Sequence, residues 1–85
     1  MLPKEVKELL QDVQMSTKKI TEREIVLFDR HSTKEDIDEL RRLAPLLSKM
    51  VIEDNTEGCK RLTTTISKIV KQRTDGKDDH RKYRD

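Results

Sequence analysis

The sequence predicts an all-α protein, and three observations support this fold class. Apolar residues recur every three or four positions, which is the spacing of one helix face. No glycine or proline lies between Pro3 and Pro45, so a helix in this stretch is not obliged to stop. Aromatic residues make up only 2% of the 85 residues, whereas charged residues make up 42%. Because large core side chains are scarce, we expect an antiparallel helical hairpin or three-helix bundle with long helices, completed by dimerisation.

A first long helix is predicted over residues 3–30. Pro3 suits the first turn of a helix, where its missing N–H is not needed. The run 25–28 alone would also suit a strand, but its place in a longer helical period favours a helix. Thr17 and Glu24 are polar positions that weaken the apolar face. The face predicted to pack against other helices consists of Val6, Leu10, Val13, Ile20 and Leu27.

A second helix is predicted over residues 33–53, after a break at 31–33. Ser32 followed by Glu35 has the spacing of a capping box, in which side chain and backbone bond reciprocally. Pro45 lies inside the helical pattern, so the helix either kinks there or ends near Leu43. We favour the kink, because the apolar phase continues across the proline. The core face of this helix consists of Ile37, Leu40, Leu47 and Val51.

A third helix is predicted over residues 57–73, after a polar segment at 53–58. Asn55 or Thr56 would cap it, although one bent helix over 33–73 is an alternative. Three consecutive threonines at 63–65 lower helix propensity, but a strand here would have no partner. Residues 74–85 are nearly devoid of apolar side chains, and we expect a disordered tail. The core face of the third helix consists of Leu62, Ile66 and Ile69.

The single cysteine and the absence of long apolar segments indicate an intracellular protein, cytoplasmic or nuclear. Cys59 has no second cysteine to pair with, which fits a reducing compartment. No signal peptide is evident, and no segment approaches the roughly 20 apolar residues that span a bilayer. We therefore expect no membrane partner. Cys59 itself lies on the apolar side of its helix, where a buried structural thiol is the expected role.

Positive charge is concentrated near the C-terminus. Residues 1–59 carry a formal charge of −3, and residues 60–85 carry +5. Cations and hydroxyl groups on one helix face are suited to a phosphate backbone, although a solvated surface has the same composition. Aromatic residues for stacking single-stranded bases are lacking, so if this face binds a nucleic acid, a double-stranded one is the remaining ligand. The candidate binding residues are Lys60, Arg61, Thr64, Ser67, Lys68, Lys71 and Arg73.

The segment 59–70 resembles the long RNA-contacting helix of certain viral helical-hairpin dimers. In that family, which suppresses RNA silencing, lysine, arginine, serine and threonine side chains face double-stranded RNA. The resemblance covers about a dozen residues of this chain and includes Lys60, Arg61 and Lys68. It implies an RNA-binding homodimer, which we keep as the alternative function.

Nothing in the sequence predicts catalysis, a metal site or a cofactor. No nucleophile elbow, phosphate loop or metal-ligand motif is present. His31 and His80 are expected to be surface residues, and the segment 75–79 lacks the register of a calcium loop. The sequence therefore predicts a small non-enzymatic helical interaction module, a self-associating adaptor or regulator.

Overall fold

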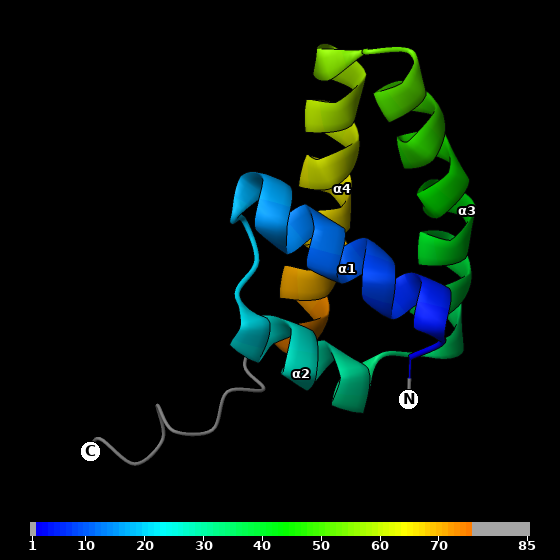
Figure 1. Ribbon diagram of the computed structural model, residues 1–85. Coiled ribbons are helices and arrows are strands. Elements are labelled where there is room, and N and C mark those ends of the chain that lie inside the picture. Colours follow the sequence, from blue (N-terminus) through cyan, green and yellow to red (C-terminus); the bar gives the residue numbers. More distant parts are fainter. Residues whose placement is uncertain (1, 76–85) are drawn as a thin grey trace.

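Four helices follow one another along residues 2–75, which are the residues that the computed structural model describes (Figure 1). They are α1 (Lys4–Thr17), α2 (Glu22–His31), α3 (Lys34–Ile52) and α4 (Thr56–Thr74). This part of the chain contains no strand, so the all-α prediction is confirmed. The expected hairpin or three-helix bundle is wrong, because the helices form a four-helix globule. The predicted dimer stays a prediction.

The single helix predicted over 3–30 is wrong, because the chain breaks between α1 and α2. Lys18 adopts a left-handed conformation with φ of 57°, which ends α1 after Thr17. A capping box then starts α2: the Glu24 N–H donates to Thr21 Oγ1, and the Thr21 N–H donates to the Glu24 carboxylate. The polar positions that weakened the predicted apolar face therefore mark a helix boundary.

The start of α3 lies one residue later than the predicted capping box. Thr33, not Ser32, caps the helix, and Asp36 takes the place expected for Glu35. The Asp36 N–H donates to Thr33 Oγ1 at 3.2 Å, and the Thr33 N–H donates to Asp36 Oδ2 at 3.1 Å. The Ser32 hydroxyl is buried and has no hydrogen-bond partner within the described chain.

The second half of the described chain is a helical hairpin. α3 continues through Pro45 to Ile52, so the alternative that ends it near Leu43 is wrong. The alternative of one helix over 33–73 is also wrong, because the chain turns at Asp54, which has φ of 59°. Asn55 then caps α4 as predicted, since its Oδ1 accepts a hydrogen bond from the Gly58 N–H at 2.9 Å.

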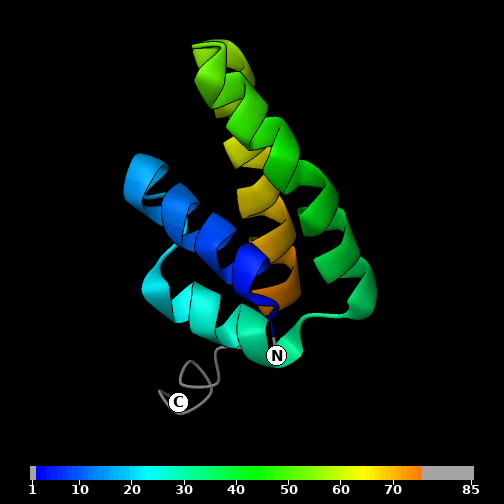
Figure 2. The same cartoon turned by 45° about the vertical axis from the view of Figure 1, so that its right-hand side comes forward.

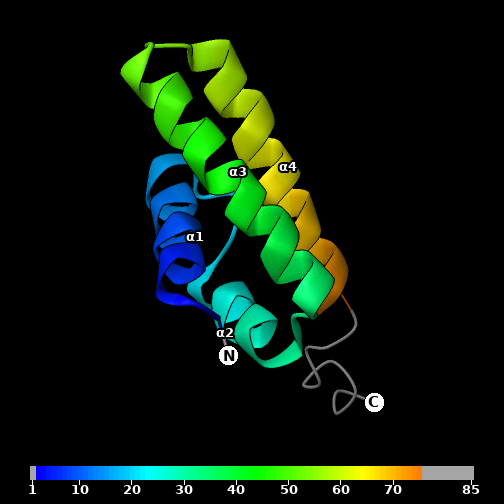
Figure 3. The same cartoon turned by 90° about the vertical axis from the view of Figure 1, so that its right-hand side faces the viewer.

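α4 is the helix on which the others pack. It lies antiparallel beside α3, and it also contacts α1 and α2 (Figure 3). α1 crosses the face of the hairpin obliquely, while α2 lies across its lower end (Figure 1). The upper end of the hairpin, where α3 turns into α4, projects beyond α1 (Figure 2). This projection leaves part of the hairpin's inner face uncovered.

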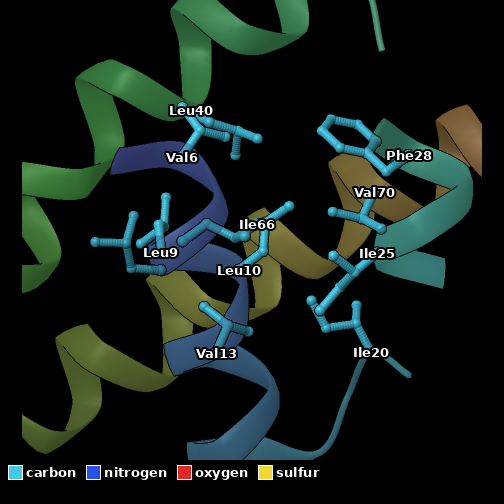
Figure 4. Close-up of a cluster of buried hydrophobic side chains, with 11 residues drawn as sticks. Val6, Leu9, Leu10, Val13, Ile20, Ile25, Phe28, Leu40, Ile66 and Val70 are labelled. Atoms are coloured by element: carbon cyan, nitrogen blue, oxygen red, sulfur yellow. The ribbon is translucent and has the colours of Figure 1, made fainter. Parts of the chain in front are cut away.

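One apolar core joins all four helices. Phe28 and Ile25 of α2 lie near Val70 of α4, while Val6 of α1 lies beside Leu40 of α3 (Figure 4). The core is therefore closed within one chain, and Phe28 is fully buried in it. The complete set of buried apolar residues is Val6, Leu9, Leu10, Val13, Ile20, Ile25, Phe28, Leu40, Leu62, Ile66 and Val70.

Most of the predicted core-face residues lie in or against this core. Ile37, Leu47 and Ile69 are partly buried and pack against it, and Leu27 is half-buried elsewhere. Val51 differs from the prediction, because its side chain is 63% exposed at the projecting end of the hairpin. Thr74, predicted as the start of a disordered tail, is buried in the last turn of α4. Residues 76–85 of that predicted tail, including His80, lie outside the described residues.

The described helices fall short of what a bilayer-spanning segment needs, in length or in hydropathy.

Candidate interaction surfaces

The outer face of α4 carries an uninterrupted set of cations. Lys60, Arg61, Lys68 and Lys71 are all exposed, and helical spacing places them within one broad face. No acidic residue occurs between Gly58 and Thr74. We call these four residues, together with Lys19, the basic face. Its four α4 residues belong to the predicted nucleic-acid site, and all four are exposed.

Lys19 is a member of the basic face that the sequence did not reveal. It lies in the linker between α1 and α2, and its Nζ donates a hydrogen bond to Thr64 Oγ1 of α4. Thr64 in turn donates to the Lys60 carbonyl at 2.8 Å. Because a continuous first helix was expected, nothing in the sequence pattern indicated that this lysine would reach α4.

Two predicted site residues are occupied elsewhere. Ser67 is only 4% exposed, and its hydroxyl donates to the Thr63 carbonyl at 2.8 Å. Arg73 leaves the basic face altogether, because its Nε donates to Asp36 Oδ2 at 2.6 Å. The neighbouring carboxylate raises the pKa of Arg73, so its charge is fixed in this pair. Both residues therefore stabilise the fold instead of facing a ligand.

An apolar groove of about 840 Å³ lies between α1 and the upper half of the α3–α4 hairpin. Leu9 and Val13 of α1 and Leu47 of α3 contribute to its lining. Large apolar side chains around it are strongly exposed: Met15 by 78%, Val51 by 63% and Ile52 by 84%. Contiguous exposed apolar surface of this kind is typical of a binding site. Sequence reasoning missed the groove because it assigned Val51 to the core.

Cys59 lines this groove from α4 and is half-buried. The reactivity of its thiol should therefore fall when a ligand occupies the groove. His31 is exposed at the last residue of α2, in agreement with the predicted surface position. Among residues 2–75, no three His, Cys, Asp or Glu side chains gather as metal ligands. The two surfaces that remain as candidate sites are the groove and the basic face.

Comparison of the chain with protein-family models, curated proteins and solved structures finds no match in any of the three.

Proposed function

We propose that this protein is a non-enzymatic interaction module whose groove binds an amphipathic helix of a partner protein. The observation that carries the proposal is the apolar groove, with Met15, Val51 and Ile52 exposed around it. Helices bind such grooves by inserting apolar side chains spaced three, four and seven residues apart. Burying three large apolar side chains that now face water supplies a driving force for this association.

The shape of the groove favours a helix over a small molecule. The groove runs along α1 from Glu5 to Thr17, a distance of about 18 Å at 1.5 Å per residue. Its walls come from separate helices, so an inserted helix would pack side by side with α1 and α3 as the protein's own helices do. A partner segment of about three turns fits this length.

The test uses a helical peptide of about 14 residues, with leucines on one face and uncharged polar residues elsewhere. Bound peptide covers Cys59, so the rate of thiol alkylation by iodoacetamide should fall as the peptide is titrated. Ile52→Glu should weaken this protection at least about tenfold, because it places a charge at the apolar rim. Val26→Glu is the matched control, since Val26 is 48% exposed on α2, outside the groove. An alkylation rate that no concentration of peptide slows would contradict the proposal.

The predicted homodimer is the alternative to the partner helix: a second copy of this chain would then occupy the same groove. A closed monomeric core removes the need for a dimer to cover Phe28, so only the groove argues for one. Sedimentation equilibrium tests it, because a groove-mediated dimer should dissociate in Ile52→Glu. A single monomeric species at all micromolar concentrations would refute dimerisation.

A phosphate-binding function is the second candidate, and the position of Lys19 favours it. Lys19 adds a fifth cation to the acid-free outer face of α4, from a different segment of the chain. Such a face suits a double-stranded nucleic acid read by its backbone. A gel-shift titration with double-stranded RNA at several salt concentrations tests this function. Absence of binding at about 50 mM salt would overturn it, because electrostatic binding is strongest at low salt.

A further inference from the structure

We propose that the helix bound in the groove is basic along one edge, with lysine or arginine residues facing α1. This inference rests on the groove being a helix-binding site, and it names the class of partner. The observation behind it is an asymmetry of charge: one rim of the groove is acidic, and the other is apolar.

The acidic rim is formed by Glu5, Glu8 and Asp12 of α1, which all line the groove and are all exposed. Their spacing of three and four residues aligns them along one face of the helix. Glu5 forms an ion pair with Arg41, in which Arg41 Nε lies 3.1 Å from the carboxylate. Glu8 and Asp12 form no hydrogen bond or ion pair through their side chains within residues 2–75. Two carboxylates beside the groove are therefore available to a ligand.

The opposite rim offers no matching charge along α3. Pro45, Ser48, Val51 and Ile52 line it, and none of them is ionisable. Lys60 of α4 is the single cation among the described lining residues. A helix lying in the groove would therefore meet apolar side chains on one side and carboxylates on the other. The complementary helix has an apolar face flanked by cations on one edge.

A second copy of this chain fits the groove less well. Its exposed apolar residues Val51 and Ile52 are followed directly by Glu53 and Asp54. Inserting this end of the hairpin would bring further carboxylates to an acidic rim, and like charges oppose association. The same argument disfavours acidic helices and anionic surfaces as occupants.

The test compares three peptides that share one apolar face of leucines and differ only in the residues on one edge: lysine, glutamine or glutamate. Protection of Cys59 from alkylation reports binding in the groove, because Cys59 lines it. At low salt, we expect the lysine peptide to bind about tenfold more tightly than the glutamate peptide. The difference should shrink at about 1 M salt, where charges are screened beyond about 3 Å.

The outcomes separate this inference from the function on which it rests. Equal protection by all three peptides would refute the basic partner and leave the helix-binding groove supported. No protection by any peptide would refute both. Cys59 protection that rises with protein concentration, without peptide, would assign the groove to a second copy and overturn the inference.

Charge-reversed variants provide the control. In Glu8→Lys/Asp12→Lys, the order of the peptides should invert, because the rim becomes basic. Asp38→Lys/Glu39→Lys changes the net charge by the same amount at two exposed positions of α3 that do not line the groove. This variant should keep the original order, and an inversion in both variants would mean that net charge, not the rim, selects the peptide.

Discussion

Arg73 of α4 forms an ion pair with Asp36 of α3, in which Arg73 Nε lies 2.6 Å from Asp36 Oδ2. The same carboxylate accepts the Thr33 N–H, so it caps α3 and binds α4 at once. The first turn of α3 is thereby joined to the last turn of α4, at the end of the hairpin away from the groove-lining residues.

The Asp36–Arg73 pair should make stability depend on pH in acid. Burial acts to raise the pKa of Asp36, but hydrogen bonds from Arg73 and Thr33, with the Arg73 charge, lower it below its ordinary value of 3.8. A lowered pKa in the folded state gives stability that is present above pH 3.8 and is lost as the pH falls through the folded pKa. Asp36→Asn should therefore reduce the free energy of unfolding at neutral pH, by less than about 1 kcal/mol because solvent screens this partly exposed pair.

Urea unfolding followed by circular dichroism at neutral and strongly acid pH tests this prediction. The difference between Asp36→Asn and the unmodified protein should vanish well below pH 3.8, where both carry an uncharged side chain. Asp38→Asn on the same helix is the control, since Asp38 is exposed. A difference that persists unchanged into acid would assign the loss to packing.

Alanine substitutions at Ser32 and Thr33, the two residues before α3, should differ in their effect on stability. Thr33→Ala removes the cap that the Asp36 N–H uses, so it should cost about 1 kcal/mol of unfolding free energy. Ser32→Ala removes a buried hydroxyl without a partner in the described chain, so it should be neutral or slightly stabilising. Chemical denaturation of both variants measures the difference. A larger loss in Ser32→Ala would place the cap at Ser32, as the sequence alone suggested.

Among the residues of α2, Phe28 should cause the largest loss of stability when its side chain is truncated. It is the largest fully buried side chain in the core, and it lies near Val70 of α4. Phe28→Ala should cost about 3–5 kcal/mol through lost burial and a residual cavity. Val26→Ala, two residues away on the exposed side of α2, should change stability by less than about 0.5 kcal/mol. Thermal unfolding of the two variants checks the prediction, and similar losses in both would contradict the described orientation of α2.

Membership of the basic face can be tested one residue at a time through the salt dependence of RNA binding. If double-stranded RNA binds there, Lys19→Gln and Lys68→Gln should each reduce the slope of log affinity against log salt by up to about 0.9. Arg73→Gln should leave this slope unchanged, because Arg73 is paired with Asp36. The opposite pattern, with Arg73 essential and Lys19 silent, would favour the face predicted from sequence alone.

The helical class, the turn near Asn55 and much of the core were predictable because they depend on local spacing. Apolar periodicity identified Leu10, Leu40 and Ile66, which are all fully buried. The break before Thr21 was missed although its capping box with Glu24 was present in the sequence. The apolar spacing of α1 continues through the linker to Ile20, which is buried although it is not in a helix. The sequence pattern therefore gave no sign of the break.

The candidate sites were less predictable, because they depend on how the helices cross. Periodicity assigns a residue to one face of its own helix, but it does not show which part of that face another helix covers. Val51 lies on the predicted face of α3, but it belongs to the last turn of that helix, in the end of the hairpin that projects beyond α1 (Figure 2). Lys19 and Thr64 are likewise far apart in the sequence and meet only because α1 ends early.

The packing of every other helix on α4 also sets the order in which this protein can fold. α4 is the last of the four helices to be synthesised, and Ile66 and Val70 complete the core from within it. Phe28 and Ile25 of α2 lie near Val70 of α4, so they cannot be buried as they are in the folded protein before α4 is available. We therefore expect the core of the nascent protein to close only after α4 has left the ribosome.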